Sequence, residues 1–294
     1  MSRTIYRERR GWAKRDCRPN TFPGTCVSPS NSKRGRFMRH IATAGLVVCL
    51  AVLALADDKV GKTAAPQLLT KSAQELRKLP GYHFKYSGSV GEQSLETKGI
   101  VWSNGLIKQA TDQGVEIWRR EKAAFAKDKN GKYVGAASLG QQEQAIVASP
   151  SPEALLNEAL GSVKAAKYVQ DESVGDFECK VVECEASQQK LKEYMEAAAK
   201  AWRPEYAAFA KSIQLNEKES YMIYRVFISK EDLVIRRVVR DTKIVIAESQ
   251  LKGRPELAAA AGGMDQVLTV ELSKHGQELD EEIPAEIKKL LQVK

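Results

Sequence analysis

Residues 82–133 decide the fold, and they begin with the stretch YHFKYSGSV at residues 82–90. Tyr82, Phe84 and Tyr86 alternate there with polar side chains. A period of two is typical of a β-strand that has one apolar face and one polar face. The stretch therefore predicts a half-buried strand at the start of the fold.

The strand signal repeats along the rest of this region. TKGIVWS at residues 97–103 ends at Asn104-Gly105, a dipeptide that is favoured in tight hairpin turns. LIKQAT at residues 106–111 and VEIWRR at residues 115–120 run back and forth, and DKNG at residues 128–131 turns the chain again. The pattern predicts an antiparallel meander.

Helices are expected before and between further strands. Apolar residues at helical spacing predict helices at 66–79, from Ser151 to 163, at 188–202 and at 204–213 (separated by Pro204), and after Pro284. Strands are predicted at 168–174, 177–185, 219–229, 233–240, 244–248 and 267–273. About ten antiparallel strands curl under their accumulated twist. We therefore expect an α+β fold: a large curved antiparallel sheet, an unclosed half-barrel, with helices packed on its concave face.

Residues 38–56 have the three parts of a secretory signal peptide. A short basic head, Met38-Arg39-His40, precedes the apolar run 41–55, and Ala54-Leu55-Ala56 has the small residues of a cleavage site. The run of about 15 residues is shorter than the ~20 that span a bilayer. We expect cleavage after Ala56 and export to the periplasm or the medium, with a retained membrane anchor as the alternative.

Residues 1–37 are basic and rich in Pro, Ser and Asn. They could form a nucleic-acid-binding tail or a long head on the signal peptide. The interpretation that we prefer is a disordered extension, or a start codon placed too early with translation beginning at Met38. The remaining residues, 57–294, are expected to form one domain.

The net charge of +9 belongs to the leading segment. Residues 1–56 contain 11 of the 46 Lys and Arg residues and 2 of the 37 Asp and Glu residues, so residues 57–294 contain 35 of each. A neutral domain offers no basic surface for nucleic acid. We expect no nucleic-acid partner.

No catalytic or metal-binding constellation is present in the sequence. His83 and His275 are the histidines of residues 57–294, and neither has a second ligand at metal spacing. Cys179 and Cys184 lie five residues apart on a predicted strand, about 16 Å at 3.3 Å per residue, which is too far for a disulfide. We expect free or buried thiols, no metal, no cofactor and no enzymatic activity, with a bridge across a bulge as the alternative.

Five aromatic residues gather in the meander. They have two interpretations: ordinary core residues, or the wall of an apolar cavity at the mouth of a curved sheet. The second interpretation makes them candidate ligand-binding residues: Tyr82, Phe84, Tyr86, Trp102 and Trp118.

Several stretches together carry a family resemblance. They are the helix at 66–79, the strand at 82–86, KGIVW at 98–102 before LIK at 106–108, the hairpin from 224–228 to 233–237, and LTVELSKHG at 268–276 before Ile283-Pro284. In this order the parts resemble the exported lipoprotein-carrier group that includes LolA, the LppX type and the RseB type. The resemblance implies an unclosed barrel whose helices form a lid over acyl chains. The helical segment 187–213 is longer than in that group, and no lipobox is present.

Two functional hypotheses follow. In the first, the domain is a non-enzymatic binding protein that holds a lipid or an acylated protein in an apolar half-barrel cavity and delivers it to a membrane-associated receptor. In the second, the same fold has a filled core and serves as a sensory or structural protein-interaction module. A cavity on the concave face distinguishes the two.

Overall fold

The structure is a computed structural model that describes residues 64–292 except 91–92, 113, 129, 136–137, 141–143, 145, 148, 203–209, 252–263, 278 and 280. Contacts divide the chain into two units, residues 1–48 and 49–294, and all described residues belong to the second. The predicted extension at 1–37, the signal peptide at 38–56 and its cleavage at Ala56 lie outside the described residues.

Twelve strands of the described chain form one antiparallel, unclosed sheet. Its order is β6-β5-β4-β3-β2-β1-β12-β11-β10-β9-β7, and β8 pairs with β9. The strands are β1 (Gly81–Val90), β2 (Gln93–Trp102), β3 (Leu106–Ala110), β4 (Glu116–Arg120), β5 (Ala123–Lys127), β6 (Tyr133–Gly135), β7 (Lys167–Tyr168), β8 (Glu172–Val174), β9 (Phe177–Glu185), β10 (Tyr221–Ser229), β11 (Ile235–Ile244) and β12 (Met264–Ser273). The edge strands β6 and β7 have three and two residues, and such short edges resist pairing with other chains.

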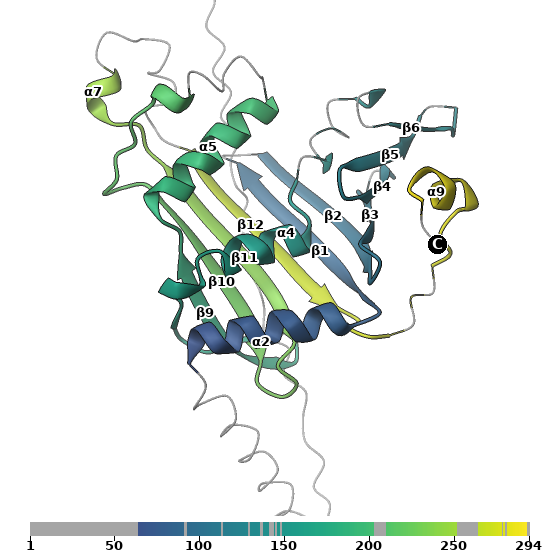
Figure 1. Ribbon diagram of the computed structural model, residues 1–294, viewed down its shortest axis with the longest axis horizontal. Helices are drawn as coiled ribbons and strands as arrows, with labels where there is room; N and C mark the ends of the chain where they lie inside the picture. Colours follow the sequence, from purple (N-terminus) through teal and green to yellow (C-terminus); the bar gives the residue numbers. More distant parts are fainter. Residues whose placement is uncertain are drawn as a thin grey trace, which may run out of the picture. The chain divides into compact units, whose positions relative to one another are not determined.

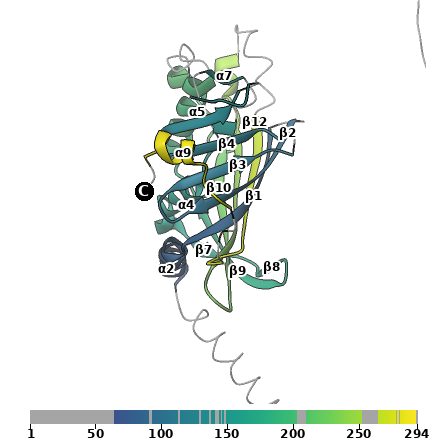
Figure 2. The same cartoon turned by 90° about the vertical axis from the view of Figure 1, so that its right-hand side faces the viewer.

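Three helices cover one face of the sheet, which we call the inner face, and Figures 1 and 2 show all three on the same side. They are α2 (Ala65–Lys78), α4 (Pro152–Leu160) and α5 (Gln188–Trp202). The curved antiparallel sheet with helices on its inner face confirms the predicted α+β fold. Smaller elements are η2 (Val163–Ala165), α7 (Glu248–Leu251) and α9 (Ala285–Leu290).

The ends of α2 and α4 follow from local sequence. Pro66 stands in the first turn of α2, where its missing N–H removes no helical bond. The Ser151 hydroxyl caps α4 by accepting a hydrogen bond from the Ala154 backbone N–H at 3.1 Å, and Pro152 follows it. These are the starts that the sequence predicts.

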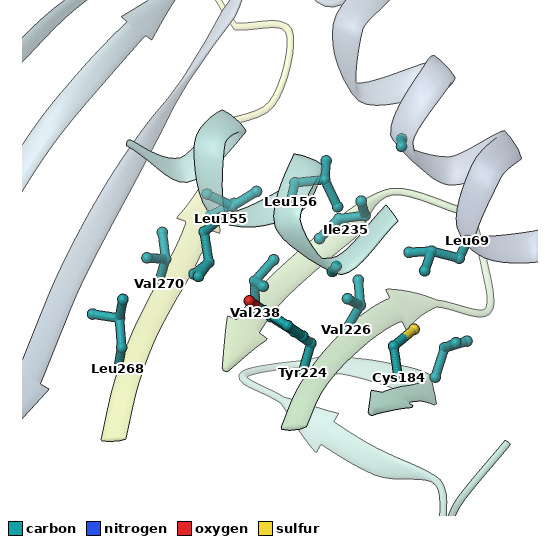
Figure 3. Close-up of a cluster of buried hydrophobic side chains, with 14 of the residues drawn as sticks. Leu69, Leu155, Leu156, Cys184, Tyr224, Val226, Ile235, Val238, Leu268 and Val270 are labelled. Carbon is teal, nitrogen blue, oxygen red and sulfur yellow. The ribbon is translucent and has the colours of Figure 1, made fainter. Parts of the chain in front are cut away.

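The main core lies between the inner face and these helices. Figure 3 shows side chains of β9–β12 pointing toward leucines of α2 and α4. Leu69, Leu155, Val226 and Ile235 have no exposed surface. Fully burying one such side chain stabilises a fold by about 1.5–3 kcal/mol, so this layer holds the helices on the sheet.

One sequence prediction for β11 is wrong. Separate strands were expected at 233–240 and 244–248, whereas β11 continues unbroken to Ile244 and α7 follows it. Thr242 and Ile244 are buried and keep the alternation of the strand, while Asp241 and Lys243 are less buried. The charged residues therefore occupy the polar face of a continuing strand and do not form a turn.

Gly99 of β2 lies opposite Phe84 of β1. A Cβ atom at Gly99 would meet the Phe84 ring at 2.4 Å and the Lys108 carbonyl oxygen at 2.2 Å. We predict that Gly99→Ala lowers the free energy of unfolding by about 1–3 kcal/mol, the usual cost of overpacking. Urea denaturation would measure it.

Gly135→Ala in β6 is the matched control, because a Cβ there meets nothing within 4 Å. Equal unfolding midpoints for the two variants would contradict the close approach of Phe84 to Gly99.

Candidate functional site

The structure divides the five candidate aromatic residues between the two faces of the sheet. Tyr82, Phe84 and Tyr86 are buried in the main core on the inner face. Trp102 and Trp118 belong to a second cluster, on the opposite face, which we call the outer face. The register explains the division: Val101 lies opposite Tyr82 and shares its core, so the next residue of β2 points the other way.

The two tryptophans stack beneath the C-terminal helix α9. Their ring centroids are 5.7 Å apart, and Ile287 and Leu291 are buried in the same cluster. Arg120 donates hydrogen bonds to the carbonyl oxygens of Leu291 and Gln292, at 3.2 and 3.0 Å, and so caps the end of α9. The chain itself therefore buries Trp118 and covers part of Trp102.

A small pocket opens on the inner face where α2 and α4 meet the ends of β1 and β2. Its volume is about 220 Å³; Leu76, Leu79, Tyr82, Val101 and Leu156 line it together with the polar residues Arg77, Ser103 and Glu153, and Trp102 borders it at the end of β2. Pockets for small molecules are typically ~300–1,000 Å³, whereas a ~150 Å³ cavity holds benzene. The pocket can take the end of an acyl chain.

The pocket has polar as well as apolar walls. Arg77 of α2 lies 3.6 Å from the Glu153 carboxylate of α4 and donates to the Asn157 side chain, so these contacts join the two helices. Burial raises the pKa of Tyr82, and Glu153 raises it further. The Tyr82 hydroxyl therefore stays neutral.

A buried arginine lies in the middle of the apolar inner face. Arg240 of β11 is 2% exposed. Its Nη1 donates to Glu158 Oε2 of α4 at 3.0 Å, and its Nη2 donates to the Tyr194 hydroxyl of α5 at 3.1 Å. The Tyr194 hydroxyl in turn donates to Gln266 Oε1 of β12 at 2.6 Å. One guanidinium thus ties two covering helices to the sheet.

The electrostatics keep this cluster charged. Burial lowers the pKa of Arg240, but Tyr194 and Glu158 more than offset it, so its pKa is raised. The Tyr224 hydroxyl donates to the same Glu158 oxygen at 3.1 Å, and burial, with Glu158 next, raises the pKa of Tyr224. The cluster of Arg240, Glu158, Tyr194, Tyr224 and Gln266 is hereafter the inner polar cluster.

A second buried arginine secures the segment before α4. Arg119 of β4 is 8% exposed, and burial lowers its pKa to about 10. Its Nη1 donates to the Ser149 carbonyl oxygen at 2.8 Å. Nearby, Gln109 Nε2 donates to Thr97 Oγ1 at 2.7 Å. Polar contacts thus hold both α4 and the segment of the chain just before it on the sheet.

The two cysteines of the described chain are as the sequence predicts. Cys179 and Cys184 are free, buried and in different clusters, which confirms the expectation of free thiols. Among the described residues, no group of three or more His, Cys, Asp or Glu side chains could hold a metal ion. Within the described part of the chain, no helix has the length and apolar content that crossing a membrane requires.

The sequence did not reveal the inner polar cluster. Glu158, Tyr194, Arg240 and Gln266 are separated by at least 26 residues along the chain, and none forms a motif with another. One local signal was present: Arg240 follows the buried Val238 by two positions, which places a charge on the apolar face of a strand. An inward arginine of this kind requires a partner.

The comparisons with known proteins found similar solved structures but no similar sequence. No protein-family model matches it, and no curated protein sequence matches it. Similar solved structures include the lipoprotein LppX of Mycobacterium tuberculosis, with 13% identity over 74% of this chain and 99% of LppX (TM-score 0.40). LprF of Mycobacterium bovis has 13% identity over 75% of this chain and 97% of LprF, with a TM-score of 0.39. A DUF1329 family protein of Desulfovibrio piger has 10% identity over 74% of this chain and 93% of that protein, with a TM-score of 0.28. LppX is the type that the sequence resemblance named.

We predict that Glu158→Gln destabilises the domain by about 1–3 kcal/mol, because it leaves the buried Arg240 guanidinium without its anionic partner. Chemical denaturation would measure the change. Asp112→Asn is the control: it removes the carboxylate of an exposed pair with Lys98, which we expect to cost less than about 0.5 kcal/mol. Equal losses would show that the inner polar cluster contributes no more than a surface pair.

Proposed function

We propose that the domain is an exported, non-enzymatic binding protein that takes up an acyl chain, from a lipid or an acylated protein, between the inner face and its covering helices. The pocket between α2 and α4 is the entry point, and the helices are a lid. The observation that carries the proposal is the inner polar cluster, in which a charged Arg240 lies beneath α4 and α5 at 2% exposure.

A permanently closed core would gain little from such a cluster. Arg240 is buried, while the side chain of its partner Glu158 is 37% exposed. Replacing a buried charge and its partner by apolar side chains is often neutral or stabilising, and such pairs are best attested as devices that specify one arrangement or switch between two. Two of the partners of Arg240, Glu158 and Tyr194, belong to the helices α4 and α5, whereas the guanidinium and its third partner, Gln266, belong to the sheet. Release of these contacts would free α4 and α5 without disturbing the strands.

The apolar contacts also favour the replacement of a covering helix by an acyl chain. An acyl chain that enters the helix–sheet layer gains about 0.8 kcal/mol per buried CH₂, and it can replace the leucine contacts that a displaced helix loses. Among the covering helices, α5 has the weakest hold: Leu191 is buried, whereas Tyr194 and Met195 are only partly buried. We propose that α5 moves first.

The alternative is a sensory or structural interaction module with a filled core. The density of the inner layer favours it, because Leu68, Leu69, Leu155 and Leu156 are each 1% exposed or less and the pocket of about 220 Å³ is small. In that case α2, α4 and α5 stay in place and partners bind elsewhere on the surface.

Expression of the whole chain in an exporting bacterial host, followed by extraction and mass spectrometry of the secreted product, tests the proposal. Stoichiometric lipid or acylated peptide is the expected result. A stable protein that is empty and also fails to bind a fluorescent fatty-acid probe would favour the filled-core module.

A pocket variant localises the binding. We predict that Leu79→Trp, which fills the pocket between α2 and α4, lowers affinity for the fatty-acid probe about tenfold, because about two methylene groups lose their burial. Leu290→Trp adds the same volume at an exposed leucine of α9 and should leave affinity unchanged. Equal affinities of the two variants would place the bound chain outside this pocket.

A further inference from the structure

A larger hollow lies on the outer face, away from the covering helices. This outer groove has a volume of about 530 Å³, within the range of small-molecule sites. Lys85 of β1 and Glu271 of β12 line it from neighbouring strands. They point outward, because the adjoining Tyr86 and Val270 belong to the inner core.

The floor of the outer groove is built by an irregularity in β11. The pairing of β10 with β11 shifts register between Phe227 and Ile228, so Arg236 is an extra residue in the ladder. In a regular strand two successive side chains point to opposite faces of the sheet. The register shift turns the side chains of both Arg236 and Arg237 toward the outer face. The Arg236 side chain lies over the Phe177 ring, with Cζ 3.6 Å from the ring centroid.

The hydrogen bonds of Arg236 hold it in place. Its residue is 7% exposed, its Nη2 donates to the Asp232 carboxylate, and its Nη1 donates to His275 Nδ1 at 2.9 Å. His275 Nε2 donates to the Ile235 carbonyl oxygen at 3.0 Å. Burial, followed by Arg236, lowers the pKa of His275 to about 4, so the ring is neutral. Arg236 Nε has no partner among the described residues.

Backbone conformation at the rim is also unusual. Lys274 lines the outer groove with φ 50°, and Leu233, which follows the lining residue Asp232, has φ 62°. Residues other than glycine rarely adopt positive φ. Such strain gathers at functional sites, where the surrounding structure maintains it.

The charges of the groove do not all cancel within the protein. Asp232 pairs with Arg236, Glu271 pairs with Arg237, and Lys85 lies 3.6 Å from Glu96. Lys274 and Asp176 line the groove from the end of β12 and from the turn between β8 and β9. Neither makes an ion pair with any described residue, so within the described part of the chain a cation and an anion on different walls have no charged partner.

We propose that the outer groove is a second binding site, for a compact zwitterion that carries one ammonium group and one anionic oxygen group. Asp176 accepts hydrogen bonds from the ammonium group, and Lys274 donates to the anionic oxygens. Val174 and Phe177 supply apolar contact between the two ends. The chemistry is shared by short peptides and by the phosphoethanolamine headgroup of lipids.

Calorimetry and NMR on the secreted protein can test this with two probes, the dipeptide Ala-Phe and glycerophosphoethanolamine. The lining residue His275 is one of two histidines in residues 57–294, so its ring signals are readily assigned from a His275→Gln spectrum. We expect at least one probe to bind at millimolar concentration and shift these signals. The probe that binds more tightly identifies a peptide or a lipid headgroup as the source.

Two variants identify the groups that recognise the ligand. Lys274→Gln and Asp176→Asn each change an exposed residue, and we expect each to weaken binding about tenfold or more, the loss typical of a hydrogen bond to a charged group. Lys288→Gln and Asp112→Asn, at exposed positions outside the groove, should bind unchanged. N-acetyl-Ala-Phe and Ala-Phe amide should each bind more weakly than Ala-Phe if the dipeptide is the better probe.

Three results would overturn the proposal. The first is that neither probe shifts the His275 signals. The second is that both groove variants bind with wild-type affinity, and the third is that the probe keeps its full affinity after one of its ends is blocked.

Discussion

A sheet with one apolar face and no second sheet must cover that face, and the other elements of this domain follow from that requirement. The inner face buries side chains from every strand between β9 and β2. Leaving them in water would cost about 25 cal/mol for each Å² of apolar surface. Three amphipathic helices provide the cover, and their own stripes of leucine and alanine become part of the same core. Helix and strand here stabilise each other.

Polar groups within this apolar layer fix how the helices are arranged on the sheet. Arg240 and Arg119 belong to the sheet, and apart from Gln266 of β12 their acceptors belong to α4, α5 and the segment before α4. Apolar contacts tolerate sliding and exchange, whereas hydrogen bonds to a guanidinium require a set geometry. The arginines therefore select one arrangement of the helices on a surface that would otherwise accept several. Under the proposed function, an acyl chain would compete with the apolar contacts but could not replace the polar ones.

The outer face is organised differently from the inner face. Its apolar clusters are small: one is sealed by α9 over Trp102 and Trp118, and one is formed by Cys179, Val181 and Phe227. Between them the charged outward residues of β1, β11 and β12 border a groove. A sheet that is apolar on one side and charged on the other can thus present two chemically different sites without a second domain, because successive residues of a strand point to opposite faces.

The spacing of apolar residues, together with turn and capping residues, was enough to predict most of the strands and helices from the sequence. The alternation at 82–90, the turn Asn104-Gly105 and the start of α4 at Ser151-Pro152 are local, and each appears in the structure as expected. The register of the strands decides which side chains share a face, and a shift of one residue exchanges the faces. For this reason the Trp102 side chain lies on the outer face, and those of Tyr82, Phe84 and Tyr86 lie on the inner face. The contact of Arg240 with Glu158 joins residues 82 positions apart. Only the folded chain creates such a contact, because it depends on where α4 comes to rest on the sheet.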